Sequence, residues 1–166
     1  AIILNSNPSS DSTEICYNLI YDCTNPVGIQ MGANGNYIAN IFVHHNTCAG
    51  NIRLQAATIN SDTCTNINIY KNIIGVGTKY PYTIGSAGNG LYPKGFRYKV
   101  LIDSNIVFGK VDSSQIAGFD WGITKCNWVQ WQDSGKDVNS ILTNPGLDAN
   151  YALPPTSPYY GIYGRD

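Results

Sequence analysis

Two nearby stretches, NIFVHHNTC at residues 40–48 and NINIYKNII at residues 66–74, carry the same order of apolar and polar positions. In each, isoleucine or valine alternates with other residues up to an asparagine, Asn46 or Asn72, and two small or apolar residues follow it. The alternation has the period of two that is typical of a strand with one buried face. Each stretch therefore predicts a strand, a bend at the asparagine and a second short strand.

The pattern occurs four times, and its asparagines lie about 26 to 33 residues apart, a period typical of stacked supersecondary units. These asparagines are Asn18, Asn46, Asn72 and Asn105. The residues five and three positions earlier are Thr13, Ile41, Ile67 and Val100, then Ile15, Val43, Ile69 and Ile102. The residues one and two positions later are Leu19, Thr47, Ile73 and Ile106, then Ile20, Cys48, Ile74 and Val107. We expect each column to stack across parallel strands, with asparagine amides hydrogen-bonded from unit to unit and asparagine backbones in the left-handed region.

The composition narrows the classes of partner. Apolar residues make up 43% of the 166-residue chain and charged residues 13%, with a formal net charge of -1. This weak charge predicts no nucleic-acid partner, and no apolar run is long enough for a membrane span.

The five cysteines form no CxxC pair, which argues against a zinc ribbon. They are either small buried side chains or disulfides of an exported protein.

Residues 40–51 and 66–77 resemble the repeats of right-handed parallel β-helix proteins, the pectin-lyase-like superfamily. Residues 128–164 resemble the closing segment of secreted bacterial β-helix proteins. The matching positions are Trp131-Gln132, Gly135, Asp137, Ser140, Asn144-Pro145, Leu147, Leu153, Pro155 and Ser157-Pro158. The resemblance implies a secreted, extracellular or cell- or virion-surface protein, in a family that includes polysaccharide lyases, hydrolases and phage tailspikes. The chain lacks the Arg-x-Pro-x-x-Arg motif of pectate lyases and the Asn-Thr-Asp, Asp-Asp and Gly-His-Gly motifs of polygalacturonases.

The predicted fold is all-β: a right-handed parallel β-helix of about five coils over residues 1–127, with a long insertion at 78–99, and a capping segment over 128–166. A fifth coil would be centred on Asn127. Apolar residues expected to cover the end of the helix are Trp128, Trp131, Leu142, Leu147 and Leu153. The apolar start at residues 1–4 resembles part of an earlier coil, so further coils upstream or another subunit are expected to cover that edge.

The insertion at 78–99 interleaves aromatic and basic residues. Aromatic rings stack on sugar rings, and cations pair with carboxylate or sulfate groups. Long loops on rigid scaffolds are often functional. The ligand-binding candidates are Tyr80, Tyr82, Tyr92, Phe96, Arg97 and Tyr98. In the alternative interpretation, the loop packs these rings onto the scaffold.

Catalytic candidates are scattered along the chain: His44, Lys99, Asp103 and Asp120. Alternation places His44 and Asp103 in one outward column with Cys16 and Tyr70. Carboxylates on adjacent strands, about 4.8 Å apart, would suit glycosidic cleavage. The sequence assigns no metal site and no cofactor, with Ca²⁺ expected only for a uronate lyase.

These observations predict a protein that interacts with a polysaccharide or surface glycan, as a secreted lyase or hydrolase, an adhesin or a tailspike. Whether it is an enzyme stays open. The alternative is a purely structural β-helix segment of an envelope or filament.

Overall fold

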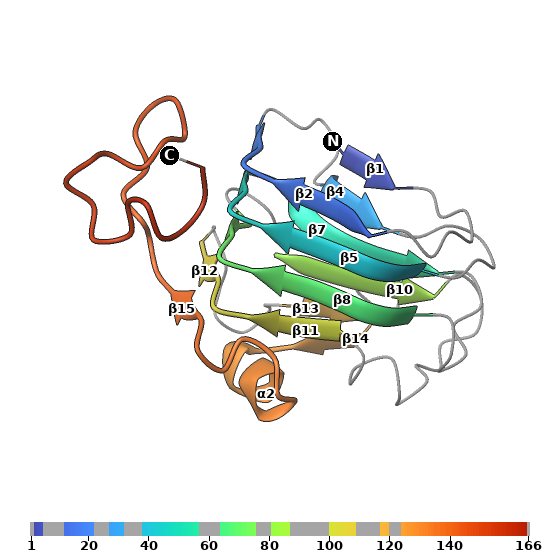
Figure 1. Ribbon diagram of the computed structural model, residues 1–166. Coiled ribbons are helices and arrows are strands. Elements are labelled where there is room, and N and C mark those ends of the chain that lie inside the picture. The colour runs from blue at the N-terminus through green and yellow to red at the C-terminus, as the bar shows by residue number, and fades with distance from the viewer. Residues whose placement is uncertain are drawn as a thin grey trace.

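The computed structural model describes residues 2–4, 12–21, 27–31, 38–56, 64–75, 81–86, 100–108, 117–119 and 124–165. Within these ranges the chain is predominantly β, as predicted, and its strands form three sheets (Figure 1). The first sheet consists of β1 (Ile2–Leu4), β4 (Val27–Met31), β7 (Asn51–Ala56), β10 (Tyr82–Ser86), β13 (Ala117–Phe119) and β14 (Thr124–Cys126). The second sheet consists of β2 (Thr13–Cys16), β5 (Ile38–His44), β8 (Cys64–Tyr70) and β11 (Val100–Asp103). The third sheet consists of β3 (Leu19–Ile20), β6 (Thr47–Cys48), β9 (Ile73–Ile74), β12 (Ile106–Val107) and β15 (Ile141–Leu142).

Successive sequence units supply strands to the sheets in a fixed rotation. After each strand of the second sheet the chain enters the third sheet and then the first, as in β2, β3 and β4, and again in β5, β6 and β7. Apart from the β13–β14 pair, strand neighbours within a sheet therefore come from successive units, and they pair in parallel. In Figure 1 the second sheet lies in front of the first, with the short strands of the third sheet along one side.

The sequence columns are confirmed as strand registers. Ile15 pairs with Val43, Val43 with Ile69, and Ile69 with Ile102. The two positions after each asparagine pair in the same way in the third sheet. A slip of one residue would turn every buried isoleucine outward, so the hydrophobic pattern enforces this register.

The inward faces of the three sheets meet in one hydrophobic core. Its fully buried members include Ile29, Met31, Ile52, Val43, Ile69, Ile102, Cys48, Ile74 and Val107. Burying one such side chain stabilises the fold by about 1.5–3 kcal/mol relative to leaving it exposed. Cys48 is thus a small buried side chain, one of the two interpretations open from the sequence.

The asparagines form the predicted ladder. The Nδ2 of Asn18 donates to Oδ1 of Asn46 at 2.9 Å, that of Asn46 to Asn72 at 2.9 Å, and that of Asn72 to Asn105 at 3.1 Å. Each backbone N–H donates to the same acceptor at 3.0 Å. Asn46, Asn72 and Asn105 are completely buried, and the ladder satisfies amides that would otherwise be costly to bury.

The prediction that these asparagines have a left-handed backbone conformation is wrong. The positive φ falls on the preceding residue: 55° at Tyr17, 51° at His45, 55° at Lys71 and 55° at Ser104. The chain bends at this preceding residue, and the asparagine that follows places its side-chain amide in the ladder. Asparagine is required here for its side-chain hydrogen bonds and not for its backbone tolerance.

The prediction of a fifth repeat unit centred on Asn127 is also wrong. Strands β13 and β14 pair antiparallel, with Ala117 opposite Cys126. Only residues 120–123 join them, whereas a parallel crossover needs about a dozen residues. Asn127 instead caps the helix α2 (Trp128–Asp133), accepting a hydrogen bond from the Gln130 amide at 2.9 Å. Among the described residues, no helix has the length and apolar character needed to cross a membrane.

The segment after β14 packs in two places. Trp128 and Trp131 contact the core at its end, as expected for a cap. Leu147 and Leu153, however, pack with Ile73 and Ile106 on the outer face of the third sheet. These isoleucines point away from the core because successive strand residues face opposite sides. The other expected capping residue, Leu142, lies in β15 and is 36% exposed.

Candidate functional site

The outer face of the second sheet brings together polar and aromatic side chains that are far apart in sequence. Strand pairing sets Cys16 beside His44, His44 beside Tyr70, and Tyr70 beside Asp103. The outward column predicted from the alternation is therefore confirmed. Glu14 lies two residues before Cys16 on β2 and so faces the same side.

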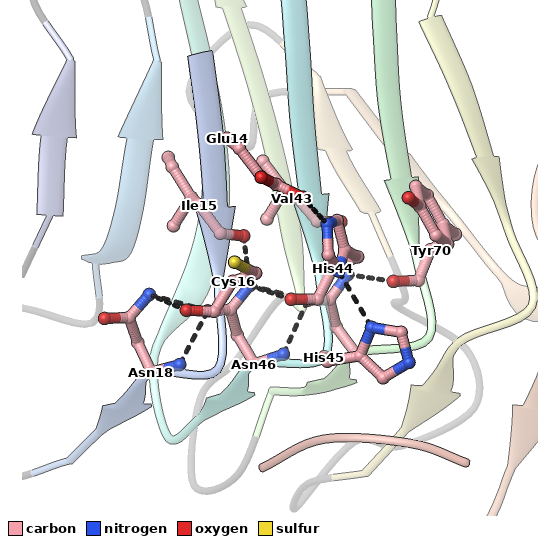
Figure 2. Close-up of polar contacts among 10 residues, drawn as sticks. Glu14, Ile15, Cys16, Asn18, Val43, His44, His45, Asn46 and Tyr70 are labelled. Carbon is pink, nitrogen blue, oxygen red and sulfur yellow. Dashed lines mark hydrogen bonds and ion pairs between the residues drawn. The ribbon is translucent and has the colours of Figure 1, made fainter.

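His44 is the centre of this face (Figure 2). Its Nε2 lies 2.5 Å from Oε1 of Glu14, and its Nδ1 lies 2.8 Å from Nδ1 of His45. The ring stacks on Tyr70 at a centroid distance of 5.0 Å and meets the ring of Tyr17 edge-on at 6.1 Å. Although His44 belongs to the outward column, these neighbours leave it only 7% exposed.

The bend before each asparagine positions two of these rings. Tyr17 and His45 occupy the same place in successive units, and both have positive φ. Their rings stack at 5.1 Å with an interplanar angle of 16°. Tyr17 remains 57% exposed. The left-handed bend therefore builds an aromatic edge beside His44, which the alternation pattern alone does not predict.

The contact with Glu14 determines the proton position at one of the two ring nitrogens of His44. A carboxylate accepts hydrogen bonds only, so Nε2 of His44 donates to Glu14. The contact between the two Nδ1 atoms needs one hydrogen, carried by His44 or by His45. Glu14, His44 and His45 are thus linked by two successive hydrogen bonds, with Glu14 as the terminal acceptor.

Cys16 completes a cluster of three ligand types. One carboxylate oxygen of Glu14, Sγ of Cys16 and a ring nitrogen of His44 all lie within 4.8 Å of one another. Burial raises the pKa of the Cys16 thiol, and the negative charge of Glu14 raises it further. Without a cation the side chain is a neutral thiol at pH 7 and a poor nucleophile.

Asp103, a catalytic candidate from the sequence, is held by the C-terminal segment. Its Oδ1 accepts the Asn139 backbone N–H at 2.7 Å and that of Ser104 at 2.8 Å. Its Oδ2 accepts Nδ2 of Asn139 at 2.7 Å. These contacts make Asp103 an anchor for the segment that follows α2.

Tyr82, a ligand-binding candidate from the sequence, faces the core. Its ring is 1% exposed and stacks on Trp131 at 5.3 Å. Burial, followed by the charge of Asp137, raises the pKa of its hydroxyl well above the usual value. Such a ring stabilises the fold and does not face a glycan. The remaining candidates lie outside the described residues: Tyr80, Tyr92, Phe96, Arg97, Tyr98, Lys99 and Asp120.

A buried Asp137 ends the asparagine ladder. It accepts Nδ2 of Asn105 at 3.0 Å, Nε1 of Trp131 at 2.8 Å and the Ser140 hydroxyl at 2.5 Å. Burial raises its pKa, and these hydrogen bonds oppose the rise. The neighbouring Lys136 donates to the Val100 carbonyl, and burial lowers its pKa to about 8. Both residues complete the end of the fold, a role that the Gly-x-Asp-x-x-Ser motif marks in the sequence.

Comparison of the chain with protein-family models, with curated proteins and with solved structures finds no match in any of the three.

His44 was among the candidates predicted from the sequence, whereas its partner Glu14 was not. The signal was present in the aligned repeats: Glu14 and Cys16 occupy alternate positions of the strand that precedes the His44 strand by one unit. The aligned columns therefore indicate which polar side chains share the outer face, in addition to which apolar ones are buried.

Proposed function

We propose that the three sheets are the sides of a right-handed parallel β-helix of the pectin-lyase-like kind, which is secreted and binds an extended polysaccharide. The fixed rotation of strands among the sheets supports this proposal, as does the buried asparagine ladder. Crossovers between parallel strands are almost always right-handed, which supports the handedness.

The observation that carries the binding proposal is the aromatic character of the outer face of the second sheet. Tyr17, His44 and Tyr70 lie on neighbouring strands or their bends, and their rings touch one another or a common ring. Phe42 and the 55% exposed Leu101 lie on the same face. Sugar rings offer apolar faces and hydroxyl groups, which match such a mixture of aromatic and hydrogen-bonding groups.

The rigidity of this face favours an extended polymer over a small molecule. Hydrogen-bonded parallel strands are already ordered, so little conformational entropy is lost when a glycan lies across them. Each stacked aromatic ring contributes on the order of 1 kcal/mol. The predicted 78–99 insertion is wrong as a continuous loop, because Tyr82–Ser86 forms β10 and pairs in parallel with β7 in the first sheet. Residues 78–80 and 87–99 lie outside the described part of the chain.

The two carboxylates on this face do not suit glycosidic hydrolysis as a pair. Glu14 lies on β2 and Asp103 on β11, the two edges of the four-stranded second sheet. Three strand spacings separate them by about 14 Å, beyond the roughly 5–9.5 Å that retaining and inverting enzymes use. Asp103 is also engaged by Asn139. Of the predicted roles, we therefore propose binding as the function of this face.

The test is a polysaccharide panel, neutral and acidic, with binding measured by affinity electrophoresis and cleavage by reducing ends and by unsaturated uronate absorbance. The key variant is Tyr17→Asn, because asparagine tolerates the positive φ at this position. Its matched control is Tyr160→Asn, which removes another exposed tyrosine from the C-terminal segment. We expect retardation by at least one polymer, weakened about fivefold or more by Tyr17→Asn and unchanged by Tyr160→Asn.

Two outcomes would count against this proposal. If Tyr17→Asn and Tyr160→Asn bound glycan equally well, the binding site would not lie on this face. Binding of no glycan, together with assembly of the protein into polymers, would favour the structural β-helix predicted as the alternative.

A further inference from the structure

The cluster of Glu14, Cys16 and His44 offers three different metal-ligating atoms on two adjacent strands. Glu14 and Cys16 project from β2, and His44 projects from β5 at the position paired with Cys16. The side chain of Glu14 is 60% exposed and that of His44 is 9% exposed. One side of the cluster is thus fixed by the sheet, and the other is open to solvent and able to adjust.

We propose that Glu14, Cys16 and His44 bind a zinc ion through Oε1, Sγ and Nε2, with a fourth position open to solvent. This inference does not depend on glycan binding. Zinc bonds of about 2.0–2.3 Å place ligand atoms roughly 3.3–3.7 Å apart in a tetrahedral site. The three ligand atoms already lie within 4.8 Å of one another, so binding needs only side-chain rotation.

Glu14 is the ligand that has to move. Its Oε1 lies 2.5 Å from Nε2 of His44, a hydrogen bond that the ion replaces. Moving the oxygen outward by about 1 Å reaches the tetrahedral spacing, and the exposed carboxylate has room to do so. The sheet holds the backbones of Cys16 and His44 in register, so these two ligands adjust by side-chain rotation alone.

His45 supplies the outer contact that a zinc-bound histidine needs. Metal-bound histidines usually engage the other ring nitrogen in a hydrogen bond, which sets the tautomer and the ring orientation. Here Nδ1 of His44 lies 2.8 Å from Nδ1 of His45. With Nε2 bound to zinc, the proton resides on Nδ1 of His44 and is donated to His45. The stacking of His44 on Tyr70 holds the ring plane.

The donor set favours zinc over calcium or magnesium. A thiolate and an imidazole are ligands for zinc and similar transition metals, whereas Ca²⁺ and Mg²⁺ take oxygen ligands. Binding releases the thiol proton of Cys16 into solvent and leaves the single ring proton of a neutral His44 on Nδ1, because the ion needs the lone pairs of Sγ and Nε2. Affinity for zinc is therefore expected to increase with pH.

The experiment uses the whole chain after treatment with a chelator and its removal. Zinc affinity is measured by competition with a colorimetric chelator, and Co²⁺ serves as a spectroscopic probe of the ligands. We expect one ion per chain and sulfur-to-cobalt charge-transfer absorption. Cys16→Ser should abolish this absorption, and Glu14→Gln should weaken zinc binding by about 100-fold. His45→Asn, which tolerates the positive φ, should weaken it by about 10–100-fold.

Two matched controls keep the test specific. Asp133→Asn removes an exposed carboxylate on α2, and Cys48→Ala removes a cysteine of the core. Both should leave zinc affinity unchanged. Circular dichroism of the metal-free variants checks folding, and zinc should raise the Tm of the wild type but not of Cys16→Ser.

The proposal is overturned if the folded wild-type chain binds no zinc, or if sulfur-to-cobalt absorption persists in Cys16→Ser. It is also overturned if Glu14→Gln and Asp133→Asn bind zinc equally well. In any of these cases the cluster is an ion pair that orders the outer face of the sheet.

Discussion

At the scale of single residues, the buried asparagines determine how the units stack. Asn72 donates Nδ2 to the carbonyls of Val43 and Tyr70 at 2.9 Å, and to Asn105 at 3.1 Å. Its Oδ1 accepts from both nitrogens of Asn46. A buried polar group without a hydrogen-bond partner costs about 1–3 kcal/mol. Asn72 alone provides hydrogen bonds to several buried backbone and side-chain groups, which an apolar side chain could not do.

We therefore expect Asn72→Ala to reduce the free energy of unfolding by about 3 kcal/mol or more, because several buried groups lose their partner together. Asn18→Ala is the matched control. Asn18 is only partly buried, and its Nδ2 donates to Cys16 and Asn46. Urea denaturation of both variants measures the difference. If both variants lost the same free energy of unfolding, the burial of Asn72 within the ladder would add nothing to stability.

At the scale of the elements, a left-handed residue connects each strand of the second sheet to one of the third. The residue varies in type: Tyr17, His45, Lys71 and Ser104. For a non-glycine residue this conformation costs roughly 1–2 kcal/mol. The strain is tolerated because the strands on both sides are hydrogen-bonded to neighbouring units.

Lys71 allows this strain to be measured, because its side chain is exposed and its φ is 55°. We expect Lys71→Asn to raise the free energy of unfolding by up to about 1 kcal/mol and Lys71→Val to lower it by at least about 1 kcal/mol. Leu101→Val, at an exposed strand position, should change it by less than about 0.5 kcal/mol. Thermal melts compare the three, and a neutral Lys71→Val would contradict the explanation.

At the scale of the whole molecule, the C-terminal segment folds back along the third sheet. Figure 1 shows it beside β12 and β15. Gly164 lies close to this sheet, and its N–H donates to the Lys71 carbonyl at 2.9 Å. A Cβ there would lie 2.7 Å from Cδ1 of Ile73 and 2.7 Å from Oγ1 of Thr47. The end of the chain thus contacts two earlier units at once.

Gly164→Ala should release this contact, whereas Gly161→Ala should not. Both glycines have positive φ, 65° and 71°, so the backbone strain of the substitution is similar. A Cβ at Gly161 meets nothing within 4 Å. We expect faster amide hydrogen exchange at Gly164 and Arg165, and faster proteolysis of the segment, only in Gly164→Ala. Equal protection in both variants would mean that the contact at Gly164 does not hold the segment.

Much of the fold could be predicted from the chain alone, because the information is local and repeated. Strands alternate with a period of two, and the same columns recur at each asparagine, so the parallel registers follow from hydrophobic burial. The ladder follows from the buried amides. The motif around Asp137 likewise marks the end of the fold in the sequence, although its partner Asn105 lies 32 residues earlier.

The candidate site depends on contacts that alternation does not encode. Glu14 and His44 are 30 residues apart, and only the register between β2 and β5 brings them within 2.5 Å. The left-handed bend sets Tyr17 and His45 face to face, and the same bend moves the strain from the asparagine to its neighbour. Tyr82 is an aromatic residue of the type that stacks on ligands, yet packing against Trp131 buries its ring. Hydrophobic periodicity specifies which face of a strand is buried, whereas the chemistry of the outer face arises from side chains that meet only after the units have stacked.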